Sequence, residues 1–389
     1  MPRNPRLIGI AALAAAVGLL PFAATARSST ESRSLRLGIF DDAHILGGDP
    51  ATVFPELIDL HVRLIRVTLW WGGAIGVAPS RPASPRDPAD PAYDWTRYDR
   101  VVRAAAASGI QVMFTILGTP VWASGSPAWN RAPKVAADLQ AFAAAAARRY
   151  DGAYAPPGAA VLPRVRYWTA WNEPNNPVFL RPQYVRAGAA WVIQSARDYA
   201  RICNAVVTGL KSDSVAKPVV ACGVTAPRGN NQPGSARASV SPLVFLRAMR
   251  SAGARGFDAY AHNPYYGSPD ETPLTPPPLG PTGRASTAVT LGNFGVLVRE
   301  VTRLYGPLRI WITEYGYQTN PPDRVFGVSW AKQALYLQQA FDVARANPRI
   351  DVLLWFLVQD EAPLGRWQSG LVTVAGKRKP SYAVFARLG

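Results

Sequence analysis

Two glutamates stand in similar surroundings, each at the end of an apolar run that contains tryptophan. Glu173 ends Tyr-Trp-Thr-Ala-Trp-Asn-Glu, and Glu314 lies in Arg-Ile-Trp-Ile-Thr-Glu-Tyr-Gly-Tyr. The chain has only seven glutamates among its 25 acidic residues. A single acid at a strand end is about as often a helix cap or an ion-pair partner as a reactive group. Two carboxyl groups that converge on one atom can divide acid–base work, because burial and mutual repulsion keep one protonated while the other is ionised.

Cleavage of a glycosidic bond needs such a pair. One carboxyl group gives its proton to the departing oxygen, and the ionised one attacks the anomeric carbon. For this to happen the two side chains must approach across a shared site, with an expected separation of roughly 5 to 5.5 Å. The elements that carry them must therefore bring residues about 140 positions apart together.

Short runs rich in β-branched and aromatic residues alternate with helical patterns, which predicts a parallel α/β fold. The predicted strands are Arg36–Phe40, Leu64–Leu69, Gln111–Leu117, Val165–Trp171, Pro218–Val224, Asp258–His262, Arg309–Thr313 and Val352–Val358. The predicted helices are Ala51–His61, Thr96–Ser108, Lys134–Tyr150, Tyr184–Leu210, Pro242–Ala252, Thr290–Tyr305, Val328–Ala346 and Ser381–Leu388.

Eight strand–helix units predict a single (β/α)8 TIM barrel. Segments 72–93, 225–241 and 263–287 are rich in Pro, Gly and Ser, and each follows a predicted strand. They should extend the C-terminal rim, where barrels build their active sites. A doubly wound sheet is the competing fold, but it gives no reason for eight units and would need a glycine-rich phosphate loop that this sequence lacks.

Glu173 and Glu314 end the fourth and seventh predicted strands, which stand three places apart on a ring of eight. Side chains alternate along a strand, so we place Glu314 with Ile310 and Ile312 on the barrel-interior face. Trp311, on the opposite face, should pack between the barrel and the helices.

The Trp171-Asn172-Glu173-Pro174 motif resembles the acid/base strand of the clan A retaining glycoside hydrolases, which include the cellulase-like family 5 and the xylosidase-like family 39. The run from Ile310 to Gly316 is similar to the nucleophile strand of that clan. The resemblance implies a (β/α)8 barrel in which Glu173 is the general acid/base, Glu314 the nucleophile and Asn172 a ligand of the sugar 2-hydroxyl. The chemistry of this cleavage requires no metal or organic cofactor.

Looser matches lie on other strands. Arg66 resembles the strand-two arginine that supports the nucleophile. His262 follows the pattern of a site histidine, with either Tyr265 or Tyr266 as the accompanying tyrosine. Trp355 resembles the tryptophan that floors the reacting-sugar subsite, although Phe356 could take that face instead.

Sugars bind on aromatic rings, because their C–H faces pack there while hydroxyls find polar partners. Aromatic residues at or just after strand ends are candidates for this role, and for each of them core packing is an even alternative. They are Trp70, Trp71, Trp122, Tyr317, Trp355 and Trp367.

The first 26 residues have the pattern of a secretory signal peptide: Arg3 and Arg6, an apolar stretch from Leu7 to Leu20, and Ala24-Thr25-Ala26. An uncleaved anchor is the lesser alternative. We expect 27–34 to be a flexible leader and 35–389 to be one catalytic domain. The protein should then be secreted to the extracellular space or the cell envelope, without membrane insertion after cleavage.

The formal charge is +17, and it is +15 without the two arginines of the first 26 residues. The excess is mostly scattered arginine, so we expect no nucleic-acid partner, and the charge gives only a hint of an acidic glycan. Three histidines in unrelated contexts argue against a metal site. Export would permit a bridge between Cys203 and Cys222, but a helix–strand layer spacing near 10 Å favours two buried thiols.

The sequence thus predicts a secreted, monomeric retaining β-glycoside hydrolase that acts on an oligo- or polysaccharide. A carbohydrate-binding surface protein without turnover is one alternative. A transglycosylase, which shares the covalent intermediate, is another. The sequence leaves the glycan and its linkage open.

Overall fold

The structure is a computed structural model that describes residues 32, 35–213, 215–279, 283, 286–363 and 365–389. The predicted signal peptide 1–26 and most of the predicted leader 27–34 lie outside the described residues.

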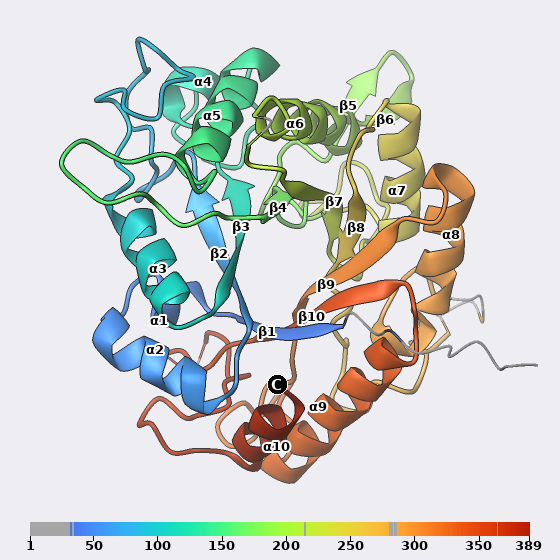
Figure 1. Ribbon diagram of the computed structural model, residues 1–389. Helices are drawn as coiled ribbons and strands as arrows, with labels where there is room; N and C mark the ends of the chain where they lie inside the picture. The colour runs from blue at the N-terminus through green and yellow to red at the C-terminus, as the bar shows by residue number, and fades with distance from the viewer. Residues whose placement is uncertain (1–31, 33–34, 214, 280–282, 284–285, 364) are drawn as a thin grey trace, which may run out of the picture. The chain divides into compact units, whose positions relative to one another are not determined.

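Eight parallel strands close into a barrel in the order β1-β10-β9-β8-β7-β4-β3-β2 (Figure 1). They are β1 Arg36–Phe40, β2 Leu64–Trp70, β3 Gln111–Leu117, β4 Tyr167–Ala170, β7 Val219–Thr225, β8 Ala259–His262, β9 Arg309–Tyr315 and β10 Ile350–Phe356. The predicted (β/α)8 barrel is confirmed. β4 and β9 are three places apart on the ring, so their ends meet across the barrel mouth.

Helices surround the barrel on its outside (Figure 1). They are α1 Asp42–Ile45, α2 Pro50–Asp59, α3 Thr96–Ala107, α4 Val121–Ser124, α5 Ala136–Arg149, α6 Gln194–Leu210, α7 Pro242–Ser251, α8 Gly295–Tyr305, α9 Trp330–Arg345 and α10 Pro380–Leu388, with a 3-10 turn at Leu291–Asn293. Within the described part of the chain, no helix is both long and apolar enough to cross a membrane.

The apolar core has two parts. The large part lies between strands and helices and includes Ile310 and Ile312. The small part fills the barrel, where the rings of Tyr167 and Trp311 lie 5.8 Å apart between centroids. The placement of Trp311 outside the barrel is therefore wrong. Its ring fits inside because β8, the strand beside β9 on one side, contributes only Ala259 and Ala261 to this cluster.

An irregularity in β9 explains how Glu314 nevertheless reaches the barrel mouth. Leu353 of β10 pairs with Ile312, but Trp355 pairs with Tyr315, so β9 has one residue more than β10 over this stretch. Such a bulge re-aims the side chains beside it. Glu314 turns from the outer face of Ile312 towards the interior, and the prediction that it shares a face with Ile312 is wrong.

The predicted helix Tyr184–Leu210 is wrong over its first ten residues. This stretch forms an antiparallel hairpin of β5 Tyr184–Ala187 and β6 Ala190–Ile193, and only α6 is helical. Gly188 sits in the turn with φ +62°, a conformation that glycine adopts without a Cβ penalty. The β-branched and aromatic residues of both arms suit strands.

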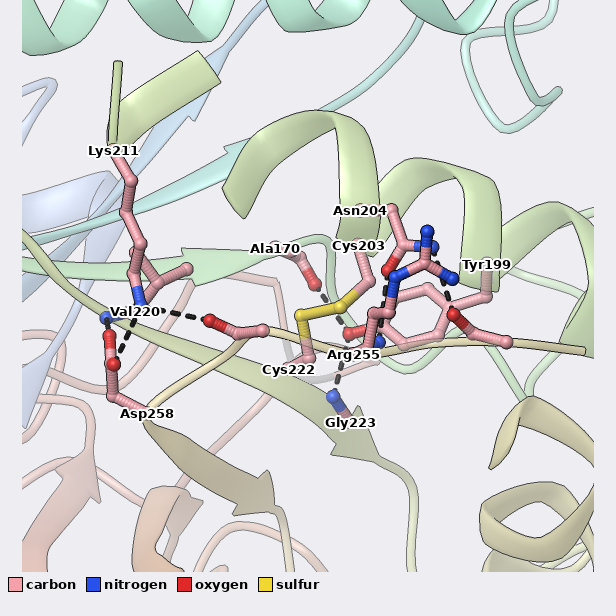
Figure 2. Close-up of a disulfide and its surroundings, with 12 residues drawn as sticks. Ala170, Tyr199, Cys203, Asn204, Lys211, Val220, Cys222, Gly223, Arg255 and Asp258 are labelled. Carbon is pink, nitrogen blue, oxygen red and sulfur yellow. Dashed lines mark hydrogen bonds and ion pairs between the residues drawn. A yellow bond between two sulfur atoms is a disulfide. The ribbon is translucent and has the colours of Figure 1, made fainter. Parts of the chain in front are cut away.

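Cys203 of α6 and Cys222 of β7 form a disulfide, with their Cα atoms 6.0 Å apart (Figure 2). The expectation of two buried thiols is wrong. The Tyr199 hydroxyl, one turn earlier on α6, donates to the Ala170 carbonyl at 2.9 Å and accepts from the Gly223 amide at 2.7 Å. These bonds draw the helix against β4 and β7, and the two cysteine side chains point at each other across the interface.

Candidate active site

A cavity of about 700 Å³ opens at the carboxyl ends of the strands. Its lining comes from segments spread along the whole barrel and combines carboxylates, two arginines, amides and aromatic rings. It includes Phe40, Asp42, Arg66, Trp70, Asn172, Glu173, Asn176, Arg228, Tyr265, Glu314, Phe356, Glu361 and Trp367. The barrel therefore brings both glutamates of the sequence motifs to one cavity.

The Glu314 carboxylate has a charged donor on one oxygen and a neutral donor on the other. Arg66 Nη1 donates to Oε1 at 2.7 Å, and the Tyr265 hydroxyl donates to Oε2 at 3.2 Å. Burial raises the pKa of Glu314, whereas the guanidinium of Arg66 and the hydroxyl of Tyr265 act in the opposite direction. These two donors favour the ionised form.

Arg66 holds this side of the site together. It is fully buried on the inner face of β2, and its Nε donates to Thr115 Oγ1 at 2.7 Å. Its Nη2 donates to Asn172 Oδ1 at 2.9 Å. Because Oδ1 of Asn172 is occupied, the amide offers its Nδ2 group to a ligand in the cavity. The guanidinium also lies over the Phe40 ring, 4.2 Å from its centroid.

Glu173 lies opposite, in a sharp turn after β4. Trp171 and Glu173 have φ of +67° and +37°, and the Glu173 amide donates to the Val224 carbonyl at 2.8 Å. Residues in this strained region persist only where the surroundings fix them. The turn ends β4 and directs the carboxyl group of Glu173 into the cavity.

Among the described residues, only amides donate to the Glu173 carboxyl group: Asn263 Nδ2 to Oε1 at 3.2 Å and Asn176 Nδ2 to Oε2 at 3.0 Å. Burial, and then the negative charge of Glu314, raise the pKa of Glu173 to about 7. Because Glu314 has the cation and Glu173 does not, a proton shared by the pair resides on Glu173. The site therefore combines a carboxylic acid with an ionised carboxylate.

Several other candidates also lie in the cavity. Trp70, Tyr265 and Trp367 line it, and the rings of Tyr265 and Trp367 are 5.3 Å apart between centroids. Of the two candidate tyrosines, Tyr265 is the one that lines the cavity and contacts Glu314. Tyr266 instead stacks on Tyr317 and donates to the Phe326 carbonyl at 2.9 Å.

Two ligand predictions on strand ends are wrong. His262 is fully buried, with Nδ1 2.7 Å from Thr225 Oγ1 and Nε2 2.9 Å from the Val289 carbonyl. Burial lowers the pKa of His262 to about 4, so it is a neutral tether between β8 and the following loop. Trp355 faces outward, and its Nε1 donates to the Ser369 carbonyl at 3.0 Å. Phe356, the alternative, lines the cavity.

The remaining aromatic candidates are part of the packing around the barrel. The Tyr317 hydroxyl donates to the Glu271 carbonyl at 2.7 Å, and Trp122 Nε1 donates to the Ala78 carbonyl at 2.9 Å. Trp71 is fully buried and stacks on Phe142. The prediction that Tyr317 and Trp122 face the substrate is wrong, because each side chain is used to anchor a loop.

Sequence reasoning missed Arg228 and Glu361, which line the cavity, and three further polar residues in or beside it. Asn263 accepts from Thr313 Oγ1 at 2.7 Å and so fixes the amide that donates to Glu173. Asn176 follows Glu173 by three residues, and Asp42 follows β1 on the rim. Asp42 accepts from the Thr68 amide at 3.0 Å, and burial raises its pKa. Position at a strand end was the available signal for Asp42 and Asn263.

The described residues contain no group of three or more His, Cys, Asp or Glu side chains arranged to hold a metal ion.

The sequence matches no protein-family model and no curated protein sequence. Solved structures do resemble it. A family 39 glycoside hydrolase from Bacteroides cellulosilyticus WH2 superposes with a TM-score of 0.62 at 19% identity, over 92% of this chain and 64% of that one. A monomeric β-xylosidase from Caulobacter crescentus CB15 gives 0.59 at 18% identity, over 92% and 68%. A β-glucosidase from Thermotoga maritima gives 0.57 at 14% identity, over 92% and 97%.

This chain therefore spans only about two thirds of the length of the first two proteins. The likeness establishes the (β/α)8 fold, which this chain shares with these glycoside hydrolases.

Proposed function

We propose that the protein is a retaining β-glycoside hydrolase of clan A that cleaves O-glycosidic bonds of an oligo- or polysaccharide. The observation that carries the proposal is the pairing of two carboxyl groups with opposite environments in one cavity. Glu314 is bound by a buried arginine at 2.7 Å, and the pKa of Glu173 is raised to about 7. The fold shared with known glycosidases supports the same assignment.

In the first step, the ionised Glu314 attacks the anomeric carbon while Glu173 gives its proton to the departing glycosidic oxygen. A glycosyl ester forms on Glu314 and the leaving sugar departs with the proton. In the second step, Glu173 takes a proton from water, the water oxygen attacks the same carbon, and the ester bond to Glu314 breaks. Two inversions give net retention.

The neighbouring residues fit these steps. The Nδ2 group of Asn172 can donate to a sugar hydroxyl beside Glu314, and the bond from the Tyr265 hydroxyl can hold the attacking oxygen in line. The rings of Trp70 and Trp367 offer apolar faces to the sugar. The basicity that Glu173 needs in the second step returns once Glu314 is esterified, because the negative charge that raised its pKa is gone.

We also propose that the protein acts outside the cytoplasm. The signal-like first 26 residues motivate this, and the Cys203–Cys222 disulfide supports it, because structural disulfides persist in oxidising compartments. Detection of the mature N-terminus near Arg27 in the medium or envelope fraction would test it. Recovery of the intact chain from the cytoplasm would contradict it.

The catalytic roles can be separated by product stereochemistry with aryl β-glycosides and added azide. Glu314→Gly should be inactive alone and should give the α-glycosyl azide, because azide takes the place of the nucleophile. Glu173→Ala should accumulate the glycosyl ester of Glu314 when the substrate has an activated aryl leaving group. With azide it should give the β-glycosyl azide, because azide then attacks the ester from the opposite face. Glu300→Gln, on α8 outside the cavity, is the matched control and should retain full activity.

Full activity of Glu314→Gln against a wild-type substrate would overturn the proposal. Tight binding of oligosaccharides without turnover over a broad glycan panel would point to a binding protein instead. Transfer to an added acceptor sugar at the expense of hydrolysis would identify a transglycosylase.

A further inference from the structure

The catalytic cavity continues into two further cavities on one side. A cavity of about 570 Å³ shares Asn176, Val178 and Arg228 with the catalytic cavity. A third cavity, of about 280 Å³, shares Pro177 and Arg181 with the second. We call the second and third cavities together the arginine groove. Its shared walls make it an extension of the catalytic cavity.

The described lining of the groove carries positive charge and no acidic side chain. Arg181 and Arg237 line the second cavity, and Arg131 lies beside Arg181 in the third. Neither Arg181 nor Arg237 forms an ion pair with a carboxylate of the described residues. Arg181 uses its Nε to bond the Pro177 carbonyl at 2.7 Å, which fixes the side chain and leaves its terminal nitrogens for a ligand.

Arg228 shows the contrast. Its Nη2 lies 2.6 Å from Glu271 Oε2 and its Nη1 donates to the Tyr265 carbonyl at 2.9 Å. This charge is therefore already compensated, and the residue braces the loop of Tyr265. The guanidinium groups of Arg181 and Arg237, by contrast, are exposed and pair with no carboxylate of the described residues.

The rest of the groove suits sugar rather than a second protein. Ser239 and Thr287 add hydroxyl groups to the second cavity, whereas the Asn230 amide in the same lining already bonds Ser235 and the Arg237 carbonyl. Trp191, on the hairpin β5–β6, is 39% exposed in the third cavity and lies beneath Arg186. Hydroxyl and amide partners with an occasional exposed ring are typical of carbohydrate subsites.

The groove begins at the acid of the pair. Asn176, which lines both cavities, donates to Glu173 Oε2 at 3.0 Å. In the proposed reaction, Glu173 protonates the departing oxygen, so the sugar bound to that oxygen lies beyond Glu173. The arginine groove is therefore on the leaving-group side.

We propose that the arginine groove binds the leaving-group portion of an anionic glycan, with carboxylate or sulfate groups of the sugar chain paired to Arg181 and Arg237. The assignment of the leaving-group side rests on the proposed function. Arginine suits this task because its planar guanidinium binds carboxylate and sulfate oxygens in pairs. A neutral glycan would leave these charges without partners.

The binding test uses the full chain carrying Glu173→Gln, so that the probes stay intact. The probes share one β-1,4-linked backbone and differ in charge: cello-oligosaccharides, β-1,4-glucuronan oligosaccharides and sulfated cello-oligosaccharides. A single-stranded DNA oligomer serves as an anion that is not a glycan. Affinities are measured by calorimetry at low and at physiological salt.

We expect the carboxylated or the sulfated chain to bind more tightly than the neutral chain, and added salt to weaken that binding. The stronger of the two identifies the anionic group. Arg181→Gln and Arg237→Gln should each weaken it by roughly 5- to 10-fold, because each removes a charge-assisted hydrogen bond at an exposed site. The control is the double variant Arg97→Gln/Arg148→Gln, on α3 and α5 outside the groove. It removes as much charge as Arg181→Gln/Arg237→Gln does, and it should leave binding unchanged.

Three results would overturn the proposal: neutral chains that bind as tightly as anionic ones, full binding by Arg181→Gln/Arg237→Gln, or an equal loss in the control variant. DNA that binds as tightly as the anionic glycan, with the same dependence on both arginines, would reassign the groove to nucleic acid. Hydrolysis of aryl β-glycosides by the wild type, whose small leaving group does not enter the groove, tests the proposed function separately. That activity should be unchanged in Arg181→Gln/Arg237→Gln.

Discussion

Replacing Glu173 by glutamine removes the proposed acid. Its effect on the free energy of unfolding, relative to the wild type, should nevertheless be more favourable at pH 8 than at pH 5. Burial and the charge of Glu314 raise the pKa of Glu173 from 4.5 to about 7. A group with a raised pKa holds its proton more tightly in the folded state. Its contribution to stability is therefore full below the unfolded pKa and is lost as the pH rises through the folded pKa. Glutamine does not ionise, so the variant avoids this loss.

The magnitude follows from the shift. A rise from 4.5 to about 7, at about 1.36 kcal/mol per pK unit, corresponds to roughly 3 kcal/mol once the pH exceeds 7. About 2.5 kcal/mol of this develops between pH 5 and pH 8. The glutamine amide also faces the Nδ2 donors of Asn263 and Asn176, and it can accept from only one of them. That mismatch costs about 1 to 3 kcal/mol, but equally at both pH values.

Urea unfolding, followed by tryptophan fluorescence, gives the free energy of unfolding of wild type and variant at pH 5 and pH 8. The change caused by Glu173→Gln should be more favourable at pH 8 by about 2.5 kcal/mol. Glu300→Gln is the control. Hydrogen bonds from Arg303 lower the pKa of Glu300 to about 2, so its stabilisation is lost only below pH 5 and the substitution should have nearly the same effect at both pH values. A pH-independent effect of Glu173→Gln, or one of opposite sign, would refute the electrostatic account of the site.

Three further perturbations test the supports of the site. Arg66→Met leaves Glu314 buried without its cation, so we expect a loss of about 3 to 5 kcal/mol in the free energy of unfolding at pH 7, measured with urea; a loss below about 1 kcal/mol would contradict the ion pair. Tyr265→Phe removes only the hydroxyl that donates to Glu314, and kcat on an aryl β-glycoside should fall roughly 10- to 100-fold with unchanged thermal stability; unchanged kcat would exclude a role for this bond in catalysis. Cys203→Ala/Cys222→Ala opens a loop with a sequence separation of 19 residues, which should lower the free energy of unfolding by about 3 kcal/mol without loss of activity; equal stability of oxidised wild type and variant would show that the bridge does not stabilise the fold.

Most of the barrel was predictable because its signals are local. The predicted strand Gln111–Leu117 agrees with β3 to the residue. Its β-branched and aromatic residues lie between Gly109 and Gly118, and this pattern is typical of a buried strand. The hairpin β5–β6 was mistaken for the start of α6. The predicted helix extends through these residues because the sequence pattern does not separate them from α6. In the structure, the turn at Gly188 pairs β5 with β6, and α6 begins only after the hairpin.

The faces of the strands were less predictable than the strands. Strict alternation predicts Trp311 outside the barrel and Glu314 inside it. The barrel interior instead holds Trp311, and the bulge in β9 adds the residue that brings Glu314 to the mouth. The bulge depends on how β9 pairs with β10, and the sequence of β9 alone does not specify that pairing. The same holds for Trp355 and Phe356, where one step of alternation decides which ring meets the cavity.

The fold class and the two glutamates can be predicted from the chain alone, because strand–helix alternation and short motifs are properties of neighbouring residues. The hydrogen-bond partners of each glutamate depend instead on how the barrel closes. Arg66 comes from β2, whereas Tyr265 and Asn263 follow β8, and the donors of these three residues reach the carboxyl groups only after the barrel closes. Asn172, which follows β4, accepts from Arg66. The pKa values of buried acids depend on such contacts over distances of a few ångströms, and those distances arise from packing among residues far apart along the chain.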